Sequence, residues 1–424
     1  MSKEKDTNGH DFMLDTVNIK IRHPAFVVLK PELFDPPLAI KRTEDIPPIM
    51  HGKNLYRKWT QNTSTTERNA GVSNIALTVH RRFEENELRH YLHVEFNVAK
   101  LLFGENLHEP RQRHLGRVVE KLIPRLRGMG VSATEAALRQ AGVTKVHFGK
   151  NVTLPYPLTV QECLEELYKA DMGERMQVNM RDYLDADDMR EYREHGESLH
   201  FHTTSRQIVF YDKLADIEKG RGASIDKEKM KKEKELREML SRQTQLVRME
   251  ARFNDQRTVR RFMSRLLPDL GDKPITFDIL FDDALCRNAL LRVWQDIIGR
   301  PANQLAFKTA ISPEDALDYF ITREVGKKSN VHTLNHTLNS FALQQIVHRM
   351  GAKKTRKKFS KVWSSKTCGT RLDDKLRDAA LTLKDLPPSR IIGIVGNDLD
   401  LFKPYGIDGN GPGLWHPGLD IIDL

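Results

Sequence analysis

Apolar and polar residues alternate along several stretches of the chain, and a period of two is typical of β-strands with one buried face. The first such stretch is MLDTVNIKIRHPAFVVL, which begins at residue 13. SNIALTVHRRF and RHYLHVEFNVA lie on either side of EENE, and this pattern predicts a hairpin. Further strands are expected at 144–154 (TKVHFGKNVTL), at 198–213 (SLHFHTTSRQIVFYDK, two strands about a polar turn) and at 246–253 (LVRMEARF).

Apolar positions that recur every three or four residues predict helices between and after these strands. RQRHLGRVVEKLIPRLRGMG at 111–130 has an apolar face and a basic face, and TVQECLEELYKAD at 159–171 is a second helix. From about residue 265 the pattern is helical, as in FDDALCRNALLRVWQDIIG, in TLNSFALQQIVHRMG, and in SPEDALDYFITREV with its Ser-x-x-Asp capping start.

We therefore predict an α+β protein with two domains and a mobile tail at 1–12. A mainly antiparallel sheet with flanking helices occupies 13–265, and an α-rich domain occupies 266–424. The Lys/Glu-rich segment at 226–240 predicts a long exposed helix with i,i+4 charge pairs.

Charge and composition narrow the class of partner. Lys and Arg number 68 against 58 Asp and Glu, and the net charge of +10 favours a polyanionic partner. The three cysteines are few, odd in number and widely spaced, which argues against a disulfide framework and for a reducing compartment. No stretch approaches the roughly 18 apolar residues of a membrane span, so we expect no membrane partner.

The segment AKKTRKKFSKVW has six basic residues and no acid between Lys353 and Lys361. Such a run either lies in solvent or contacts nucleic acid, and the sequence leaves both interpretations open. No phosphate-binding loop is present, because GIVGN at 393–397 lacks the Lys-Ser/Thr pair that holds phosphate and metal.

FYDK contains a candidate nucleophile. Tyr211 and Lys213 are two residues apart, so they share one face if the strand continues through both. A tyrosine attacks a phosphodiester as its phenolate, and because the free pKa is about 10, a nearby ammonium would help to stabilise that form. The alternative is that Tyr211 is a half-buried strand aromatic.

Candidate metal ligands lie on neighbouring predicted strands. Glu250 shares a strand face with Arg248 and Arg252, and it is the best acidic ligand unless it serves only in ion pairs with them. His200 and His202 share a face in LHFHT, and a His-hydrophobe-His strand is by analogy the metal-binding element of many DNA nickases.

Five stretches, in order, resemble the gene II/X family of filamentous-phage replication initiators, which is related to the initiators of rolling-circle plasmids. They are MLDTVNIKI, YLHVEFNVAKLLFGENL, TKVHFGKNV, TTSRQIVFYDK and LVRMEARF, and together they span roughly 13–265. The resemblance implies that Tyr211 is the nicking tyrosine, Lys213 its partner, Glu250 a metal ligand and Arg206 a contact to DNA phosphate.

The chain departs from that family in the central strand, where similar proteins carry an aspartate and this one has Lys145-Val146-His147. Histidine binds Mn²⁺ readily and Mg²⁺ poorly. Either His147 replaces the acid, joined by His202, or the metal site shifts toward Asp15.

The expected function is that of a rolling-circle replication initiator in a bacterial host's cytoplasm. It would nick and reseal origin DNA through a 5′-phosphotyrosyl intermediate with Mg²⁺ or Mn²⁺, while host proteins supply helicase and polymerase. The residues expected to contact DNA are Arg206, Arg248, Arg252, Lys100, Lys353, Lys354, Arg356, Lys357 and Lys358. Two alternatives are a relaxase of a plasmid or integrative element with the same chemistry, and a non-enzymatic DNA-binding protein.

Overall fold

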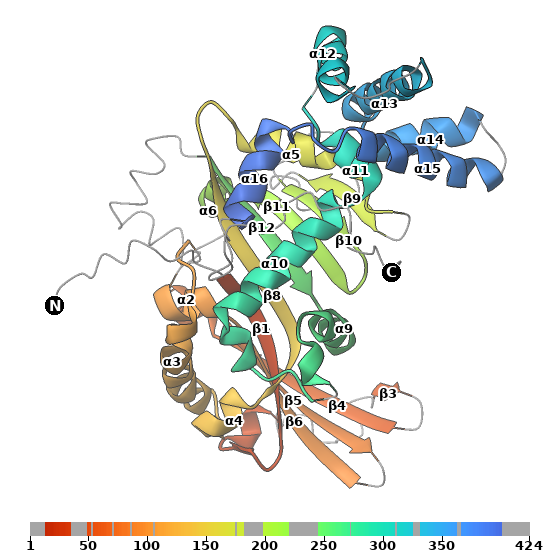
Figure 1. Cartoon of the computed structure of the whole chain (residues 1–424). Coiled ribbons are helices and arrows are strands. Elements are labelled where there is room, and N and C mark those ends of the chain that lie inside the picture. The colour runs from red at the N-terminus through yellow and green to blue at the C-terminus, as the bar shows by residue number, and fades with distance from the viewer. Residues whose placement is uncertain are drawn as a thin grey trace. The chain divides into compact units, whose positions relative to one another are not determined.

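The computed structural model describes residues 13–34, 49–51, 54–69, 72–84, 87–104, 107–173, 176–181, 198–219, 245–271, 273–309, 312–324, 331–362 and 366–400 (Figure 1). The predicted tail at 1–12 and the predicted helix at 226–240 lie outside these residues. The chain divides into two compact units, Met1–Thr153 with His202–Leu290, and Leu154–Phe201 with Leu291–Leu424.

The chain forms a ten-stranded sheet, most of which belongs to the first unit. Its strands lie in the order β3 (Ile49–His51), β4 (Asn54–Asn62), β5 (Ile75–Glu84), β6 (Glu87–Asn97), β1 (Met13–Arg22), β8 (Gly142–Leu154), β12 (Gln245–Phe253), β11 (Arg206–Asp212), β10 (Ser198–His202) and β9 (Gln177–Arg181). The pairings of β1 with β6 and β8, of β11 with β12, and along β3 to β6 are all antiparallel. These pairings confirm the predicted sheet, and β5 with β6 forms the predicted hairpin.

The central strands of the sheet, β1, β8 and β12, each have one apolar and one polar face, as their alternation predicts. Val17, Ile19 and Ile21 of β1 are buried on the apolar face. On the polar face, Lys145 of β8 lies 2.7 Å from Glu95 of β6, and Asn18 of β1 donates to the same carboxylate. This polar face positions the site described below.

Among the described residues of the first unit the helices are α1 (Thr65–Asn69), α2 (Val98–Phe103), α3 (Leu115–Gly128), α4 (Glu135–Arg139), α6 (Lys213–Lys219) and α9 (Gln256–Leu266), and a small sheet pairs β2 (Phe26–Val28) with β7 (Val131–Ala133). In α3 the predicted apolar face is buried at Val118, Val119 and Leu122. Helix α9 stacks Phe262 on Phe253 of β12, with ring centroids 4.2 Å apart. It therefore packs on the apolar face.

The second unit is rich in helices: α5 (Val160–Tyr168), α11 (Pro301–Ala306), α12 (Pro313–Glu324), α13 (Val331–Met350), α14 (Ala352–Val362), α15 (Lys366–Thr382) and α16 (Arg390–Asp400). Helix α10 (Asp283–Ile298) includes residues of both units. The predicted capping start of α12 is confirmed, because Ser312 and Asp315 each accept the other's backbone N–H. None of the helices that the structure describes is long and apolar enough to cross a bilayer.

The two units divide the chain differently from the predicted boundary at 265. Residues after 265 stay with the first unit because Val143 donates its N–H to Ile275 and Phe277 donates its N–H to Ala141. The segment from 154 belongs to the second unit because Asn303 of α11 binds the backbone of Asp171. Neither contact has a signature in the hydrophobic pattern.

Two histidines on the polar face should make the protein acid-sensitive. His80 and His93 lie with ring centroids 4.3 Å apart. Burial and the charges of Lys58 and Lys20 lower the pKa of His80 to about 4, and burial with the neighbouring His80 lowers the pKa of His93 to about 3. The unfolded chain takes up these protons below about pH 6.5, whereas the folded chain does not.

We therefore expect the free energy of unfolding to fall as the pH falls from 6.5 toward 4, by up to about 1 kcal/mol per pH unit for each histidine. Urea titrations at pH 7 and pH 5 measure this loss. It should shrink in His93→Gln and stay unchanged in His108→Gln, a substitution at an exposed site. An equal loss in all three proteins would contradict the assignment.

Candidate functional site

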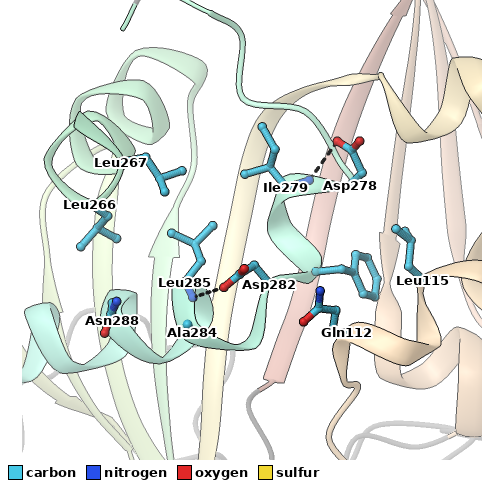
Figure 2. Close-up of a pocket in the computed structure, with 11 residues that line it drawn as sticks. Gln112, Leu115, Leu266, Leu267, Asp278, Ile279, Asp282, Ala284, Leu285 and Asn288 are labelled. Carbon is cyan, nitrogen blue, oxygen red and sulfur yellow. Dashed lines mark hydrogen bonds between the residues drawn. The ribbon is translucent and has the colours of Figure 1, made fainter. Parts of the chain in front are cut away.

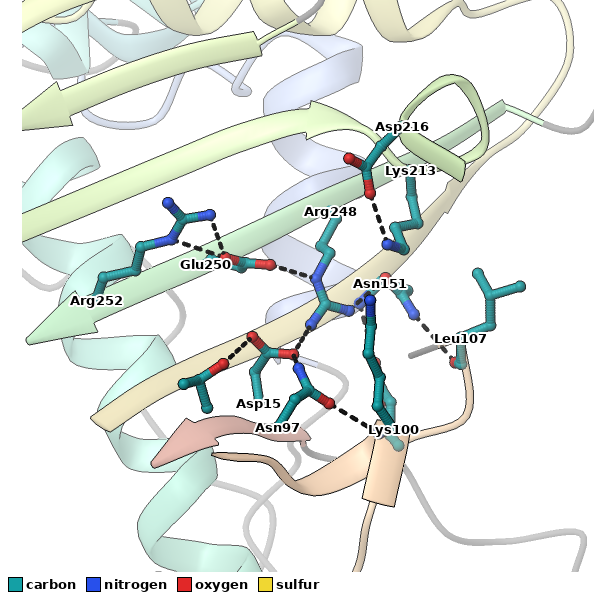
Figure 3. A network of polar contacts seen from close by, with 12 residues as sticks. Asp15, Asn97, Lys100, Leu107, Asn151, Lys213, Asp216, Arg248, Glu250 and Arg252 are labelled. Atoms are coloured by element: carbon teal, nitrogen blue, oxygen red, sulfur yellow. Dashed lines mark hydrogen bonds and ion pairs between the residues drawn. The ribbon is translucent and has the colours of Figure 1, made fainter. Parts of the chain in front are cut away.

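The polar face of the central strands carries a buried cluster of charged side chains (Figure 3). Arg248, Glu250 and Arg252 project from β12 on the same face, as their spacing predicts. Tyr211 of β11 lies opposite Arg248 in the sheet register. Asp15 reaches the cluster from a bulge in β1, where the pairing with β8 shifts between Leu14 and Val17. Bulges of this kind re-aim side chains next to functional sites.

The guanidinium of Arg248 joins three strands. Its side chain is 0% exposed, and it donates to Glu250 Oε1 at 2.7 Å, to Asp15 Oδ1 at 2.9 Å and to Asn151 Oδ1 at 3.0 Å. Gly149 of β8 provides the space for it, because a Cβ there would lie 2.8 Å from Arg248 Nη2. A buried charge is tolerated only when it is paired in this way.

Glu250 is held by four donors. Oε1 accepts from Tyr211 and Arg248, each at 2.7 Å, and Oε2 accepts from Arg252 Nε at 2.8 Å and Nη2 at 2.6 Å. Burial alone would raise the pKa of Glu250, but the guanidiniums of Arg252 and Arg248 and the Tyr211 hydrogen bond hold it well below 4.5. Glu250 is therefore a carboxylate at neutral pH.

The Tyr211 side chain lies inside the cluster and is not a surface aromatic. Its residue is 5% exposed, and its hydroxyl donates to Glu250 over 2.7 Å. Burial and the charge of Glu250 raise the pKa of Tyr211 well above 10. The phenol therefore keeps its proton in this arrangement. To act as a nucleophile, it would need additional positive charge nearby.

Lys213 lies beside Tyr211, but the two residues do not share one strand as predicted. Strand β11 ends at Asp212, and Lys213 is the first residue of α6. Its ammonium is 5.7 Å from the centroid of the Tyr211 ring and 2.8 Å from Asp216 Oδ2. The lysine side chain is buried and paired with Asp216, so its position next to the phenol is fixed.

Asp15, His147 and Glu250 form a group that could hold a metal ion. One ligand atom from each lies within 4.8 Å of the others. His147 Nε2 is 3.1 Å from Asn254 Oδ1, and with that oxygen as acceptor the proton sits on Nε2 and Nδ1 keeps its lone pair. Burial and the charge of Arg252 lower the pKa of His147, so the imidazole is neutral at pH 7.

Two carboxylates and a neutral imidazole are a suitable ligand set for a divalent transition metal, and these residues fit one. The sequence left two alternatives for this site, His147 replacing a family aspartate or a shift toward Asp15. The structure brings both residues to Glu250. Neither His200 nor His202 of β10 belongs to the group, and His200 instead lies 3.2 Å from Ser198 Oγ.

The first unit holds four of the residues expected to contact DNA, and each of them lies in a different environment. Arg206 is on the opposite face of β11, 5.7 Å from the Phe253 ring and 5.9 Å from the Phe262 ring, so the structure does not bring it to Tyr211. Arg248 is fully enclosed and offers no surface to a phosphate. The Arg252 side chain is 28% exposed and marks the side of the cluster that solvent reaches. Lys100 is half-buried on α2.

The predicted basic run at 353–361 forms most of α14. Four of its five lysines, Lys353, Lys354, Lys357 and Lys358, are exposed. Arg356 differs, because it pairs with Asp171 at 3.1 Å and with Asp373 at 2.7 Å, which ties α14 to its neighbours in the second unit. The lysines remain candidates for phosphate contacts, whereas Arg356 has a structural role.

Sequence reasoning missed the residues that support the cluster. Asn97, at the end of β6, donates to Asp15 Oδ1 at 2.7 Å, and Asn151 binds Arg248. Gly149 and Asn151 follow His147 at intervals of two, so the strand period already places all three on one face. That spacing was the signal available for finding them.

A pocket of about 450 Å³ lies elsewhere in the first unit (Figure 2). Leucines from α3, α9 and α10 line it, and no residue of the cluster does. Its carboxylates are engaged with backbone N–H groups, Asp278 with Ile279 and Asp282 with Leu285. These two carboxylates are therefore not available for chemistry in the pocket.

No protein-family model, no curated protein and no solved structure matches the chain. The chemistry of the cluster itself therefore carries the functional argument.

The space under Arg248 can be tested by Gly149→Ala. The added methyl group would collide with a guanidinium that three partners hold in place, so we expect a loss of about 1–3 kcal/mol in unfolding free energy. Gly128→Ala at the end of α3 is the control, because a Cβ added there would have no neighbour within 4 Å. That change should be neutral or stabilising by up to about 1 kcal/mol. A neutral Gly149→Ala would show that Arg248 is loosely held.

Proposed function

We propose that this protein is a rolling-circle replication initiator that nicks and rejoins origin DNA through Tyr211, with a divalent metal on Asp15, His147 and Glu250. One observation carries the proposal: the Tyr211 hydroxyl lies 2.7 Å from Glu250, which belongs to the one metal-ligand group found among the described residues. A phenol, a carboxylate and a neutral imidazole in one cluster are the parts that phosphotyrosyl transfer requires.

In the proposed reaction, the Tyr211 oxygen forms a bond to phosphorus while the bond from phosphorus to the 3′ oxygen breaks. The phenol proton passes to Glu250 Oε1, its hydrogen-bond partner, and the departing 3′ oxygen takes up a proton from water to become a hydroxyl. The 5′-phosphotyrosyl link keeps the bond energy, so the same site can reseal the strand without a nucleotide cofactor.

When bound, the metal would polarise the scissile phosphate and lower the pKa of a nearby hydroxyl. His147 favours Mn²⁺ over Mg²⁺, because Mg²⁺ prefers oxygen ligands. When protonated, Lys213, whose ammonium lies 5.7 Å from the centroid of the Tyr211 ring, would favour the phenolate. Asn254 holds the His147 ring, and Asn97 holds Asp15.

The proposal is tested by trapping the covalent intermediate. The protein is incubated with Mn²⁺ and a random-sequence pool of single-stranded DNA, and SDS-resistant adducts are isolated and sequenced. We expect the native chain to form adducts that share a sequence, and Tyr211→Phe to reduce their yield by at least about 10³-fold, because no phenol oxygen remains to attack.

Tyr156→Phe is the matched control, because that tyrosine is 93% exposed and lies outside the cluster. It should leave the adduct yield unchanged. Tight DNA binding with no adduct in any of the three proteins would instead support a non-enzymatic DNA-binding protein.

The lysines of α14 are proposed to contact DNA phosphates. Each neutralised phosphate adds about 0.7 to 0.9 to the slope of log affinity against log salt. Lys353→Gln/Lys357→Gln should therefore lower the magnitude of that slope by about 1.5, as measured by fluorescence anisotropy across a salt series. Lys375→Gln/Lys384→Gln removes the same charge from exposed positions on and after α15 and should change the slope little. Equal effects of both pairs would indicate nonspecific attraction.

A further inference from the structure

The charges of the cluster are already balanced within the protein. Asp15 and Glu250 carry the negative charges of the cluster, and Arg248 and Arg252, which pair with them, carry the positive charges. A divalent cation at Asp15, His147 and Glu250 would therefore add two uncompensated charges to a buried site. Binding of that cation becomes favourable if one of the two guanidiniums leaves.

The two arginines differ in how firmly they are held. Arg248 is fully buried, lies against Gly149 and binds three partners on three strands. The Arg252 side chain is 28% exposed, and its guanidinium is held by one carboxylate oxygen, Glu250 Oε2. No other residue that the structure describes pairs with the Arg252 guanidinium. A rotation of its side chain into water would release it.

Release of Arg252 frees the oxygen that a metal needs. Glu250 Oε1 stays with Tyr211 and Arg248, so their hydrogen bonds persist, while Oε2 loses both of its donors. Asp15 Oδ2 has only a 3.2 Å contact from Thr16 among the described residues. Asn254 contacts His147 at Nε2, which leaves Nδ1 as the ring nitrogen without a described partner. Each of the three ligands then offers an available atom.

We propose that Arg252 is a displaceable counter-cation, which holds Glu250 until a divalent metal binds Asp15, His147 and Glu250 in its place. The freed guanidinium remains close to the site, and its planar donors suit a phosphate diester. This second role rests on the proposed nicking function and deepens it. Metal binding would add positive charge to the site and would also free the Arg252 guanidinium to bind the DNA phosphate. The exchange itself depends only on the cluster.

Mn²⁺ binding tests the exchange without any DNA. Electron paramagnetic resonance of free Mn²⁺ gives the Kd of the metal for each variant. Because two cations compete for one carboxylate, Arg252→Gln should bind Mn²⁺ at least about tenfold more tightly than the native chain. Arg252→Lys keeps the charge but loses the fork of donors, so its Kd should lie between the two.

Two controls accompany this measurement. Arg125→Gln removes an arginine whose side chain is 25% exposed and pairs with Glu67, away from the cluster, and it should leave the Kd unchanged. Glu250→Gln should weaken Mn²⁺ binding strongly, which assigns the signal to this site. Thermal unfolding checks that each variant is folded. An Arg252→Gln Kd equal to or weaker than the native value would overturn the exchange, and so would the absence of Mn²⁺ binding to both proteins.

The adduct assay separates this inference from the proposed function. If Arg252 also serves the phosphate, Arg252→Gln should bind Mn²⁺ more tightly and yet form at least about tenfold less covalent adduct. Tighter Mn²⁺ binding with no adduct even in the native chain would leave the exchange standing and reject nicking. Adducts from the native chain with an unchanged Mn²⁺ Kd in Arg252→Gln would support nicking and reject the exchange.

Discussion

The buried guanidinium of Arg248 is the interaction on which the site depends. It ties β12 to Asp15 of β1 and to Asn151 of β8, and it fixes the carboxylate that the Tyr211 hydroxyl contacts. Taking such a charge out of water is costly, and only a complete set of acceptors makes it tolerable. The bulge in β1 and the missing side chain at Gly149 both serve this arrangement.

The same interaction keeps the proton on the Tyr211 phenol and indicates how the phenol could lose it. Its hydroxyl donates to a carboxylate whose charge is held by two arginines, and burial opposes loss of its proton. Reactivity therefore depends on a change of charge at Glu250. Arg252, the partner on the side that solvent reaches, is the residue through which such a change can occur with the core of the cluster left intact.

Much of the fold follows from apolar residues that recur every two positions in strands and every three or four in helices, because those periods show which face of each element is buried. They placed Arg248, Glu250 and Arg252 together and paired β5 with β6. They could not show that Asp15 turns through a bulge into the cluster, because a bulge is set by the pairing of distant strands. Nor could they show that Arg206 packs by Phe262 on the other face, since that depends on where α9 docks. The unit boundary likewise depends on long-range hydrogen bonds near Ile275 and Asp171.

The central claim is that Tyr211 is the nucleophile of a metal-dependent reaction on DNA. Mass spectrometry tests it most directly: the protein is incubated with Mn²⁺ and single-stranded DNA, digested with nuclease and protease, and its peptides are sequenced. We predict a nucleotide attached through phosphate to Tyr211, formed only when Mn²⁺ is present. A nucleotide on another residue, or none on any peptide under conditions where the protein binds the DNA, would contradict it.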